Sequence, residues 1–256
     1  MDLFDLTGKT ALITGSTRGI GLAIAERMAE RGANVVISSR KADACDEAAA
    51  GIRERGGSVL AQAANISDKV ALQALVDRTL AEWGQIDILV CNAAVNPYFG
   101  PLTGISDEAF DKIMASNVRS NLWLCGMVLP QMVARRDGAI VIVSSIAGLK
   151  GNKMLGAYGI SKAADFQLAR NLAVEYGPHN IRVNAIAPAI VRTDFAKRLW
   201  EDPELYAQAI KSYPLGRIGE PDDVAGAAIF LASRAGAFVT GHVLTVDGGV
   251  TIGGAE

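Results

Sequence analysis

Short apolar runs alternate with helical patterns along the whole chain, and this alternation constrains the fold more than any other feature. The runs are rich in Val, Ile, Leu and Ala, as is typical of strands buried on both faces. Strands separated by helices imply right-handed crossovers and therefore a parallel sheet. We expect strands at residues 11–14, 35–38, 59–63, 86–91, 139–143, 181–186 and 243–246, and helices at 19–31, 43–55, 68–83, 107–136, 157–176 and 221–231.

The pattern predicts one α/β domain over residues 1–256, of the doubly wound Rossmann type: a mostly parallel, seven-stranded sheet with helices on both faces. Segment 194–214 looks helical but irregular, and its position predicts a lid over a substrate. Ligands of such sheets bind beyond the carboxyl ends of the strands. We therefore expect the chemistry in the loops after Thr14, Ser39, Cys91, Val143 and Ile186.

Composition and charge exclude several classes of protein. A formal net charge of −2 argues against a surface for nucleic acid, and no apolar run reaches the about 20 residues that span a bilayer. Cys45, Cys91 and Cys125 are widely spaced, so neither a metal site nor a disulfide framework is expected. The first residues lack the layout of a signal peptide. We expect a cytoplasmic protein without a metal, nucleic-acid or membrane partner.

A glycine-rich segment, Thr14-Gly15-Ser16-Thr17-Arg18-Gly19-Ile20-Gly21, lies between the first strand and the first helix. Its glycines allow a tight turn and let a pyrophosphate approach the helix N-terminus, where free N–H groups favour anions. A tight turn alone would also explain glycines, but a strand before and a helix after match a dinucleotide fingerprint. The predicted cofactor contacts here are Gly15, Thr17, Arg18, Gly19, Ile20 and Gly21.

The end of the second strand indicates which dinucleotide is bound. A site for NAD places Asp or Glu there to accept a hydrogen bond from the ribose 2′-hydroxyl. This chain has Ser38 and Ser39, followed by Arg40 and Lys41. A guanidinium binds a 2′-phosphate through paired hydrogen bonds, and Arg18 is placed to reach the same phosphate. The alternative is that these are solvated surface charges; we predict NADP(H) in preference to NAD(H), held in part by Ser39 and Arg40.

Tyr158 and Lys162 are four residues apart and share one face of a predicted helix. A neighbouring ammonium favours the phenolate form of a tyrosine, so Tyr158 is a candidate to exchange a proton with a substrate oxygen. Ser145, just past the fifth strand, is placed to donate a hydrogen bond to the same oxygen. Tyr-x-x-x-Lys also arises by chance on surface helices. The prediction of a catalytic role therefore rests on where this pair lies in the chain.

Together these motifs resemble the short-chain dehydrogenase/reductase family over nearly the whole chain. The resemblance rests on Thr14-Gly15-x-x-x-Gly19-x-Gly21, Cys91-Asn92-Ala93-Ala94, Ser116-Asn117-Val118, Ser145, Tyr158 with Lys162, Pro188-Ala189 and Asp247-Gly248-Gly249. It implies an oxidoreductase that transfers a hydride between the cofactor and a carbonyl or alcohol carbon. It also implies catalytic roles for Asn117, Ser145, Tyr158 and Lys162, and cofactor contacts from Asn65, Ile66, Asn92, Ala93, Tyr158, Lys162, Pro188, Ile190 and Thr193.

The family likeness also implies roles for individual residues, and the chain departs from the family pattern at three positions. Asn117 would help hold a water that links Lys162 to solvent, and Lys162 would bind the nicotinamide ribose. Ala94 and Ala189 stand where glycine is common in the family, and Asn65 stands where many members have Asp. We expect all three departures to be tolerated, because they touch the cofactor's surroundings and not the proton path.

A narrower likeness is to the branch called dehydrogenase/reductase member 4, the NADP-dependent carbonyl and retinal reductases. It rests on Ser38-Ser39-Arg40-Lys41, on residues 92–100 and on Val143-Ser144-Ser145-Ile146-Ala147. Animal members of the branch end in a peroxisomal tripeptide that this chain lacks, which favours a cytoplasmic microbial relative. The family likeness further implies a homo-oligomer, a dimer or tetramer, that pairs helices 107–136 and 157–176.

The expected substrate is a small, largely apolar ketone, aldehyde or secondary alcohol, because the predicted pocket is apolar and aromatic. Its predicted lining is Asn96, Tyr98, Phe99, Ile146, Leu155, Phe195, Leu199 and Trp200. One alternative is a 3-oxoacyl thioester reductase, which would need a basic patch for an acidic acyl carrier protein, and the sequence does not clearly show such a patch. The other is a non-catalytic cofactor-binding sensor, which would be free to lose the four catalytic residues that this chain retains.

Overall fold

The computed structural model describes residues 2–253, and within them seven strands form one sheet. The spatial order is β3-β2-β1-β4-β5-β6-β7, and every neighbouring pair is parallel. The sheet is therefore entirely parallel, where the sequence predicted a mostly parallel one. The strands are β1 (Thr10–Thr14), β2 (Asn34–Ser38), β3 (Val59–Ala61), β4 (Ile88–Cys91), β5 (Gly138–Val143), β6 (Ile181–Pro188) and β7 (Val243–Val246).

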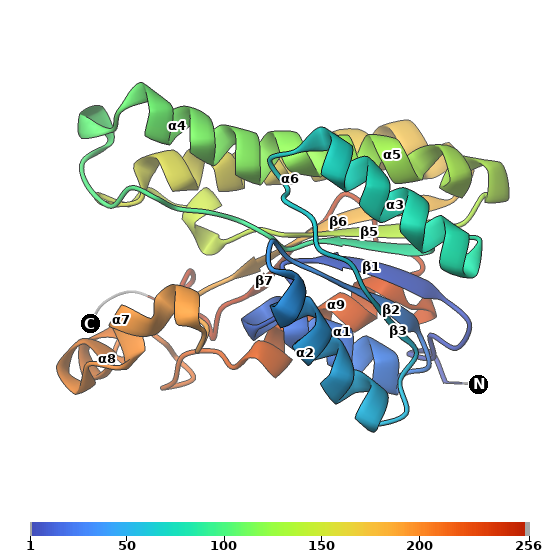
Figure 1. Ribbon diagram of the computed structural model, residues 1–256. Coiled ribbons are helices and arrows are strands. Elements are labelled where there is room, and N and C mark those ends of the chain that lie inside the picture. Colours follow the sequence, from blue (N-terminus) through green and yellow to red (C-terminus); the bar gives the residue numbers. More distant parts are fainter. Residues whose placement is uncertain (1, 254–256) are drawn as a thin grey trace.

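Helices cover both faces of the sheet (Figure 1). One face carries α1 (Gly19–Glu30), α2 (Ala42–Glu54) and α9 (Pro221–Ala232); the other carries α3 (Lys69–Trp83), α4 (Asp107–Met114), α5 (Ser120–Arg135) and α6 (Gly156–Tyr176). Each layer buries its own apolar cluster against the strands. Two short helices, α7 (Lys197–Trp200) and α8 (Pro203–Ile210), lie apart from these layers, near the carboxyl ends of the strands.

Several element boundaries differ from the predicted ones. The third strand ends at Ala61, two residues early, and the sixth continues to Pro188. Helix 107–136 is α4 and α5 joined by a π-helical turn, Ala115–Arg119. Such turns are frequent at functional sites, and this one contains Asn117. Within residues 2–253, no helix is both long and apolar enough to traverse a bilayer.

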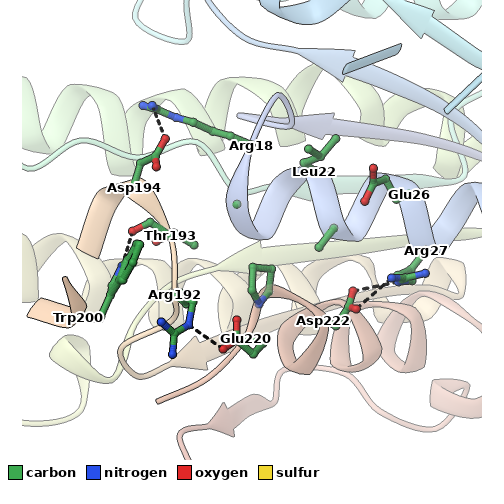
Figure 2. A pocket seen from close by; sticks show the side chains of 13 residues that line it. Arg18, Leu22, Glu26, Arg27, Arg192, Thr193, Asp194, Trp200, Glu220 and Asp222 are labelled. Atoms are coloured by element: carbon green, nitrogen blue, oxygen red, sulfur yellow. Dashed lines mark hydrogen bonds and ion pairs between the residues drawn. The ribbon is translucent and has the colours of Figure 1, made fainter. Parts of the chain in front are cut away.

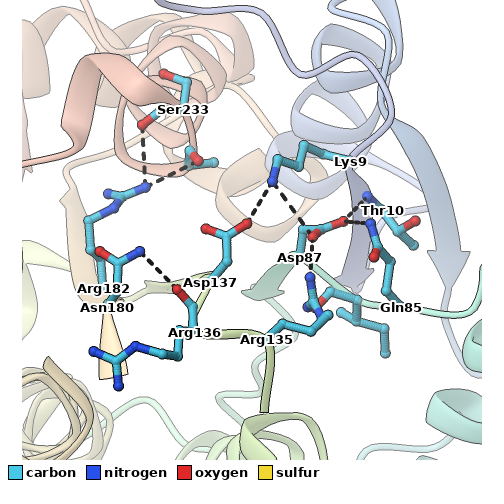
Figure 3. Close-up of polar contacts among 12 residues, drawn as sticks. Lys9, Thr10, Gln85, Asp87, Arg135, Arg136, Asp137, Asn180, Arg182 and Ser233 are labelled. Atoms are coloured by element: carbon cyan, nitrogen blue, oxygen red, sulfur yellow. Dashed lines mark hydrogen bonds and ion pairs between the residues drawn. The ribbon is translucent and has the colours of Figure 1, made fainter. Parts of the chain in front are cut away.

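A polar network ties the amino-terminal ends of the strands together (Figure 3). Asp87, which is 3% exposed, accepts hydrogen bonds from Arg135 at 2.7 Å and from the Thr10 backbone N–H at 2.9 Å. Lys9 lies 3.8 Å from Asp87 and 2.7 Å from Asp137, on the outer side of the network. Asp87 therefore joins the starts of β1 and β4 to the end of α5, at the edge opposite the predicted site.

Replacing Asp87 by Ala should lower the free energy of unfolding by about 3 kcal/mol, because Arg135 and the Thr10 N–H lose a buried acceptor. Urea denaturation followed by circular dichroism measures the change. Asp137→Ala is the matched control: its carboxylate is 49% exposed, so its loss should cost less than about 1 kcal/mol. Equal losses in the two variants would contradict a special role for the buried carboxylate.

Candidate active site

A cleft of about 2190 Å³ opens along the carboxyl ends of the strands. Residues from the loops after β1, β2, β4, β5 and β6, where the sequence predicted the chemistry, line it, and so do residues 64–67 after β3. Parallel strands bring these loops to one edge, so residues far apart in the sequence become neighbours. Nearly all of the predicted cofactor contacts line this cleft; among them are Thr17, Ile20, Asn65, Ile66, Ala93, Pro188 and Ile190.

The glycine-rich turn has the backbone geometry that its glycines permit. Gly15 and Gly19 adopt positive φ values of 64° and 56°, a region that disfavours residues with a Cβ. Gly21 does not line the cleft but lies beneath the turn, where a Cβ would collide with the Gly15 carbonyl and the Asn92 side chain. The Asn92 amide nitrogen donates to the carbonyls of Thr14 and Gly15 at 3.0 Å each, so it holds the turn against the end of β4.

Ser16 is a second anchor of this turn, and the sequence analysis gave it no role. Its buried hydroxyl donates to the Ile13 carbonyl at 2.7 Å and accepts from the Ser38 N–H at 2.9 Å. It thereby joins the ends of β1 and β2 directly below the cleft. The sequence feature that could have indicated this role is a small polar residue inside the glycine motif, next to a buried strand.

The N-terminus of α1 is open toward the cleft. Its N-cap residue, Arg18, makes no side-chain capping bond, and no acidic residue lies in the first turn. The Thr193 methyl group lies 2.9 Å from where a Cβ of Gly19 would stand, so the loop after β6 closes against the same turn. Free N–H groups, a glycine cradle and a flanking hydroxyl residue fit the pyrophosphate of a dinucleotide.

Two cations are available at the end of β2. Arg40 and Lys41 line the cleft beside Ser39, both are exposed, and neither has an ion-pair partner among residues 2–253. Arg18 differs, because its guanidinium pairs with Asp194 of segment 194–214 at 3.0 Å (Figure 2). The two side chains are 73% and 60% exposed, so this pair is weak and can open to a phosphate.

Ser145, Tyr158 and Lys162 all line the cleft. The Lys162 Nζ lies 5.6 Å from the centre of the Tyr158 ring, whose other neighbour, the Phe195 ring, is 6.1 Å away. The Ser145 hydroxyl accepts from the Ala147 N–H at 3.1 Å, which fixes the loop after β5. A phenol, a hydroxyl and an ammonium therefore border one space, as proton exchange with a substrate oxygen requires.

Asn117 is fully buried in the π-helical turn and does not line the cleft. Its amide nitrogen donates to the Val95 carbonyl and to the Ser161 hydroxyl, each at 3.0 Å, and its oxygen accepts from the Val95 N–H at 2.8 Å. The side chain thus fastens the loop after β4 to α6, one residue from Lys162. Its role in holding a water stays a prediction.

Lys162 has a partner that the sequence analysis missed. Its Nζ donates to the Val143 carbonyl and to Asp165 Oδ2, both at 3.1 Å, and the side chains of Lys162 and Asp165 are 2% and 0% exposed. Burial acts to lower the pKa of Lys162, but attraction to Asp165 and Tyr158 outweighs it and raises the pKa. The sequence feature that could have indicated this partner is an acidic residue three positions after the lysine, on the buried face of α6.

Six of the eight predicted substrate contacts line the cleft: Asn96, Phe99, Ile146, Leu155, Phe195 and Leu199. Two are corrected. Tyr98 turns its hydroxyl to the Pro101 carbonyl at 2.8 Å, and Trp200 donates from Nε1 to the Thr193 carbonyl at 2.9 Å. Trp200 instead borders an adjoining cavity of about 650 Å³, which shares Arg18 and Thr193 with the cleft (Figure 2).

The far wall of the cleft includes Leu205 and Ala209 of α8, which the sequence analysis did not select. Their spacing of four residues places both on one helix face, and this was the available signal. Segment 194–214 consists of a short 3₁₀ turn, Asp194–Ala196, followed by α7 and α8. It borders the cleft as a lid would, and its motion stays a prediction.

Comparison with known proteins now bears on this geometry. A family model described as Enoyl-(Acyl carrier protein) reductase matches residues 15–251. Dehydrogenase/reductase SDR family member 4 of Oryctolagus cuniculus is 43% identical over 244 residues, which cover 95% of this chain and 94% of the relative. The chain belongs to the short-chain dehydrogenase/reductase family.

Solved structures agree with this assignment. A gluconate 5-dehydrogenase from Burkholderia cenocepacia J2315, in complex with NADP and tartrate, has a TM-score of 0.94 and 33% identity, covering 99% of each chain. A 7α-hydroxysteroid dehydrogenase complexed with NADH and 7-oxo glycochenodeoxycholic acid has a TM-score of 0.92 and 38% identity, covering 99% of this chain and 97% of its own. The chain is thus an NAD(P)-dependent oxidoreductase of this family.

Gly21→Ala should weaken dinucleotide binding by about tenfold or more, because the new methyl group displaces the Gly15 carbonyl from the cradle. Isothermal titration with NADPH measures the loss. Gly126→Ala is the matched control, since in the described part of the chain no atom outside the backbone of α5 itself and the two neighbouring residues lies within 4 Å of its Cβ position. The control should bind normally and gain about 0.5–1 kcal/mol of stability; unaltered binding by Gly21→Ala would contradict the assignment.

Proposed function

We propose that this protein transfers a hydride between NADP(H) and the carbonyl or alcohol carbon of a small, largely apolar ketone, aldehyde or secondary alcohol. The observation that carries the proposal is that Ser145, Tyr158 and Lys162 line the same cleft as the glycine cradle. Around them, Phe99, Ile146, Leu155, Phe195, Leu199 and Leu205 supply a mainly apolar lining.

The bound cofactor would supply or accept the hydride at its nicotinamide ring. Tyr158 would donate a proton to the substrate oxygen during reduction and take it back during oxidation. The Ser145 hydroxyl would hydrogen-bond the same oxygen, and the Lys162 ammonium would stabilise the phenolate. Two of the three Nζ–H donors of Lys162 go to Val143 and Asp165, which leaves one for a ribose hydroxyl.

The preference for NADP(H) rests on this chain's own residues, because the similar structures contain either NADP or NADH. β2 ends in serine, and no acidic residue beside Ser39 lines the cleft to repel a 2′-phosphate. The guanidinium of Arg40 and the ammonium of Lys41 have no ion-pair partner within residues 2–253. A bound phosphate would therefore meet cations that need not first break an ion pair.

A 3-oxoacyl thioester is the second candidate substrate. Lys112, Arg119, Lys150 and Lys197 are exposed and line the cleft, as a site that receives an acidic carrier protein would require. The description of the matching family model also names an acyl-carrier-protein substrate. An apolar ketone needs none of these cations, so the substrate classes can be separated by direct assay.

Tyr158→Phe should reduce turnover by about a thousandfold, because the proton donor is lost while the ring and its packing remain. Oxidation of NADPH is followed by absorbance with ketones, aldehydes and 3-oxoacyl thioesters. Tyr176→Phe, at the far end of the same helix, is the control and should retain full activity. Normal turnover by Tyr158→Phe on the best substrate would contradict the proposed mechanism.

Arg40→Asp should weaken NADPH binding by about a hundredfold, because a charge-assisted contact becomes a repulsion. NADH lacks the 2′-phosphate, so its dissociation constant should change little. Arg53→Asp makes the same charge reversal at an exposed site on α2 outside the cleft, and should leave both dissociation constants unchanged. Equal losses for NADPH and NADH in Arg40→Asp would remove the cofactor preference.

A further inference from the structure

Asp165 is a fully buried carboxylate for which the proposed mechanism has no use. It lies on α6, three residues after Lys162, with its side chain 0% exposed. Burying a carboxylate is costly unless it is paired and hydrogen-bonded. What Asp165 contacts therefore indicates what it does.

Its two carboxylate oxygens contact two different side chains. Oδ2 lies 3.1 Å from the Lys162 Nζ, and Oδ1 accepts a hydrogen bond from the Asn121 amide nitrogen at 3.0 Å. The same nitrogen donates to the Asn117 carbonyl at 2.7 Å. Asp165 thus joins Lys162 on α6, through Asn121 on α5, to Asn117 in the π-helical turn.

This arrangement fixes the position of the Lys162 ammonium. The Val143 carbonyl and Asp165 hold it from two sides, and the Asn121 hydrogen bond fixes the carboxylate in turn. Burial raises the pKa of Asp165, while Lys162, Asn121 and Ser144 favour its charged form. Attraction to Asp165 and Tyr158 raises the pKa of Lys162 in spite of burial, so the charged form of the ammonium is favoured.

A carboxylate beside the ammonium also changes what Tyr158 experiences. An unpaired ammonium near the phenol would favour phenolate with a full unit charge. Paired with Asp165, it acts as a dipole, and the opposing charge removes part of its effect. The pair therefore favours the phenolate less strongly than an unpaired lysine would.

We propose that Asp165 is a positioning residue that holds the Lys162 ammonium in place and sets the pH at which Tyr158 releases its proton. The proposal rests on the proposed function, in which Tyr158 exchanges that proton with substrate. Among the described residues, the other titratable group that acts on the pair is Cys91 of β4, which lies beside Cys125 of α5. The hydrogen bond to Cys125 and burial raise the pKa of Cys91 well above its ordinary value, so this thiol adds no competing charge.

The direct test is a spectroscopic titration of Tyr158 in the protein without ligands. Tyrosinate absorbance is followed against pH in wild type and Asp165→Asn, each with and without Tyr158→Phe, so that the difference isolates Tyr158 from the other four tyrosines. Asp165→Asn keeps the shape and removes the charge. Attraction to Tyr158 still favours the charged form of Lys162 in this variant, so the Tyr158 midpoint should fall by about one pH unit, whereas an unchanged or higher midpoint overturns the proposal.

Two further variants keep this test decisive. Glu175→Gln removes an exposed charge from the far end of the same helix and should leave the midpoint unchanged. If Asp165→Asn does not fold, Asp165→Ala replaces it, because the space it opens can admit water beside Lys162. Its midpoint should fall in the same direction, and a folded Asp165→Ala with the wild-type midpoint also overturns the proposal.

The kinetic arm separates this inference from the proposed function. With an alcohol that the wild type oxidises, the acidic limb of the pH–kcat profile should move to lower pH in Asp165→Asn. A residue with a purely structural role would lower Tm and kcat without moving that limb, and this result counts against the proposal. If the wild type turns over no carbonyl or alcohol, the proposed function fails, while the tyrosinate titration still decides the role of Asp165.

Discussion

All seven strands run in the same direction, so each ends at one edge of the sheet. Beyond that edge the backbone leaves the ladder, and its polar groups need other partners. Asn92 and Ser16 supply them by bonding the carbonyls and N–H groups at the ends of β1 and β2. The parallel arrangement gathers the loops, and these buried polar side chains hold them in one geometry. The cleft depends on both.

The two edges of the sheet use charge differently. At the amino-terminal edge, Asp87 is buried among Lys9, Arg135 and the Thr10 N–H, so its charge is satisfied within the protein (Figure 3). At the carboxyl edge, Arg40 and Lys41 are exposed, with no ion pair among residues 2–253. A satisfied network stabilises a fold, whereas available cations favour an incoming anion. The carboxyl edge is thus suited to bind an anionic ligand, and the amino-terminal edge to stabilise the fold.

Local pattern was enough to predict the alternation of strands and helices, the glycine turn and the pairing of Tyr158 with Lys162, because each depends on periodicity or on short spacing along the chain. The directions of individual side chains could not be predicted in this way. Tyr98 and Trp200 were placed in the pocket by their chemistry, yet each turns its polar atom to a nearby carbonyl. Ser16 and Asp165 were missed for a related reason: their partners lie on other elements or on a buried helix face, and only the folded chain shows which groups they satisfy.

Stability alone does not account for a buried pair such as Lys162 and Asp165, since replacing such a pair with apolar residues is often neutral or stabilising. Lys162 cannot be replaced if its ammonium is to reach the cleft and act on Tyr158. Once a lysine is buried there, desolvation favours its neutral form, and a neutral amine would no longer stabilise a phenolate. Asp165 and Tyr158 both oppose that loss of charge, and Asp165 also weakens the field that Tyr158 experiences. The carboxylate therefore reduces the effect of the ammonium on Tyr158 and, through the same contact, fixes its position.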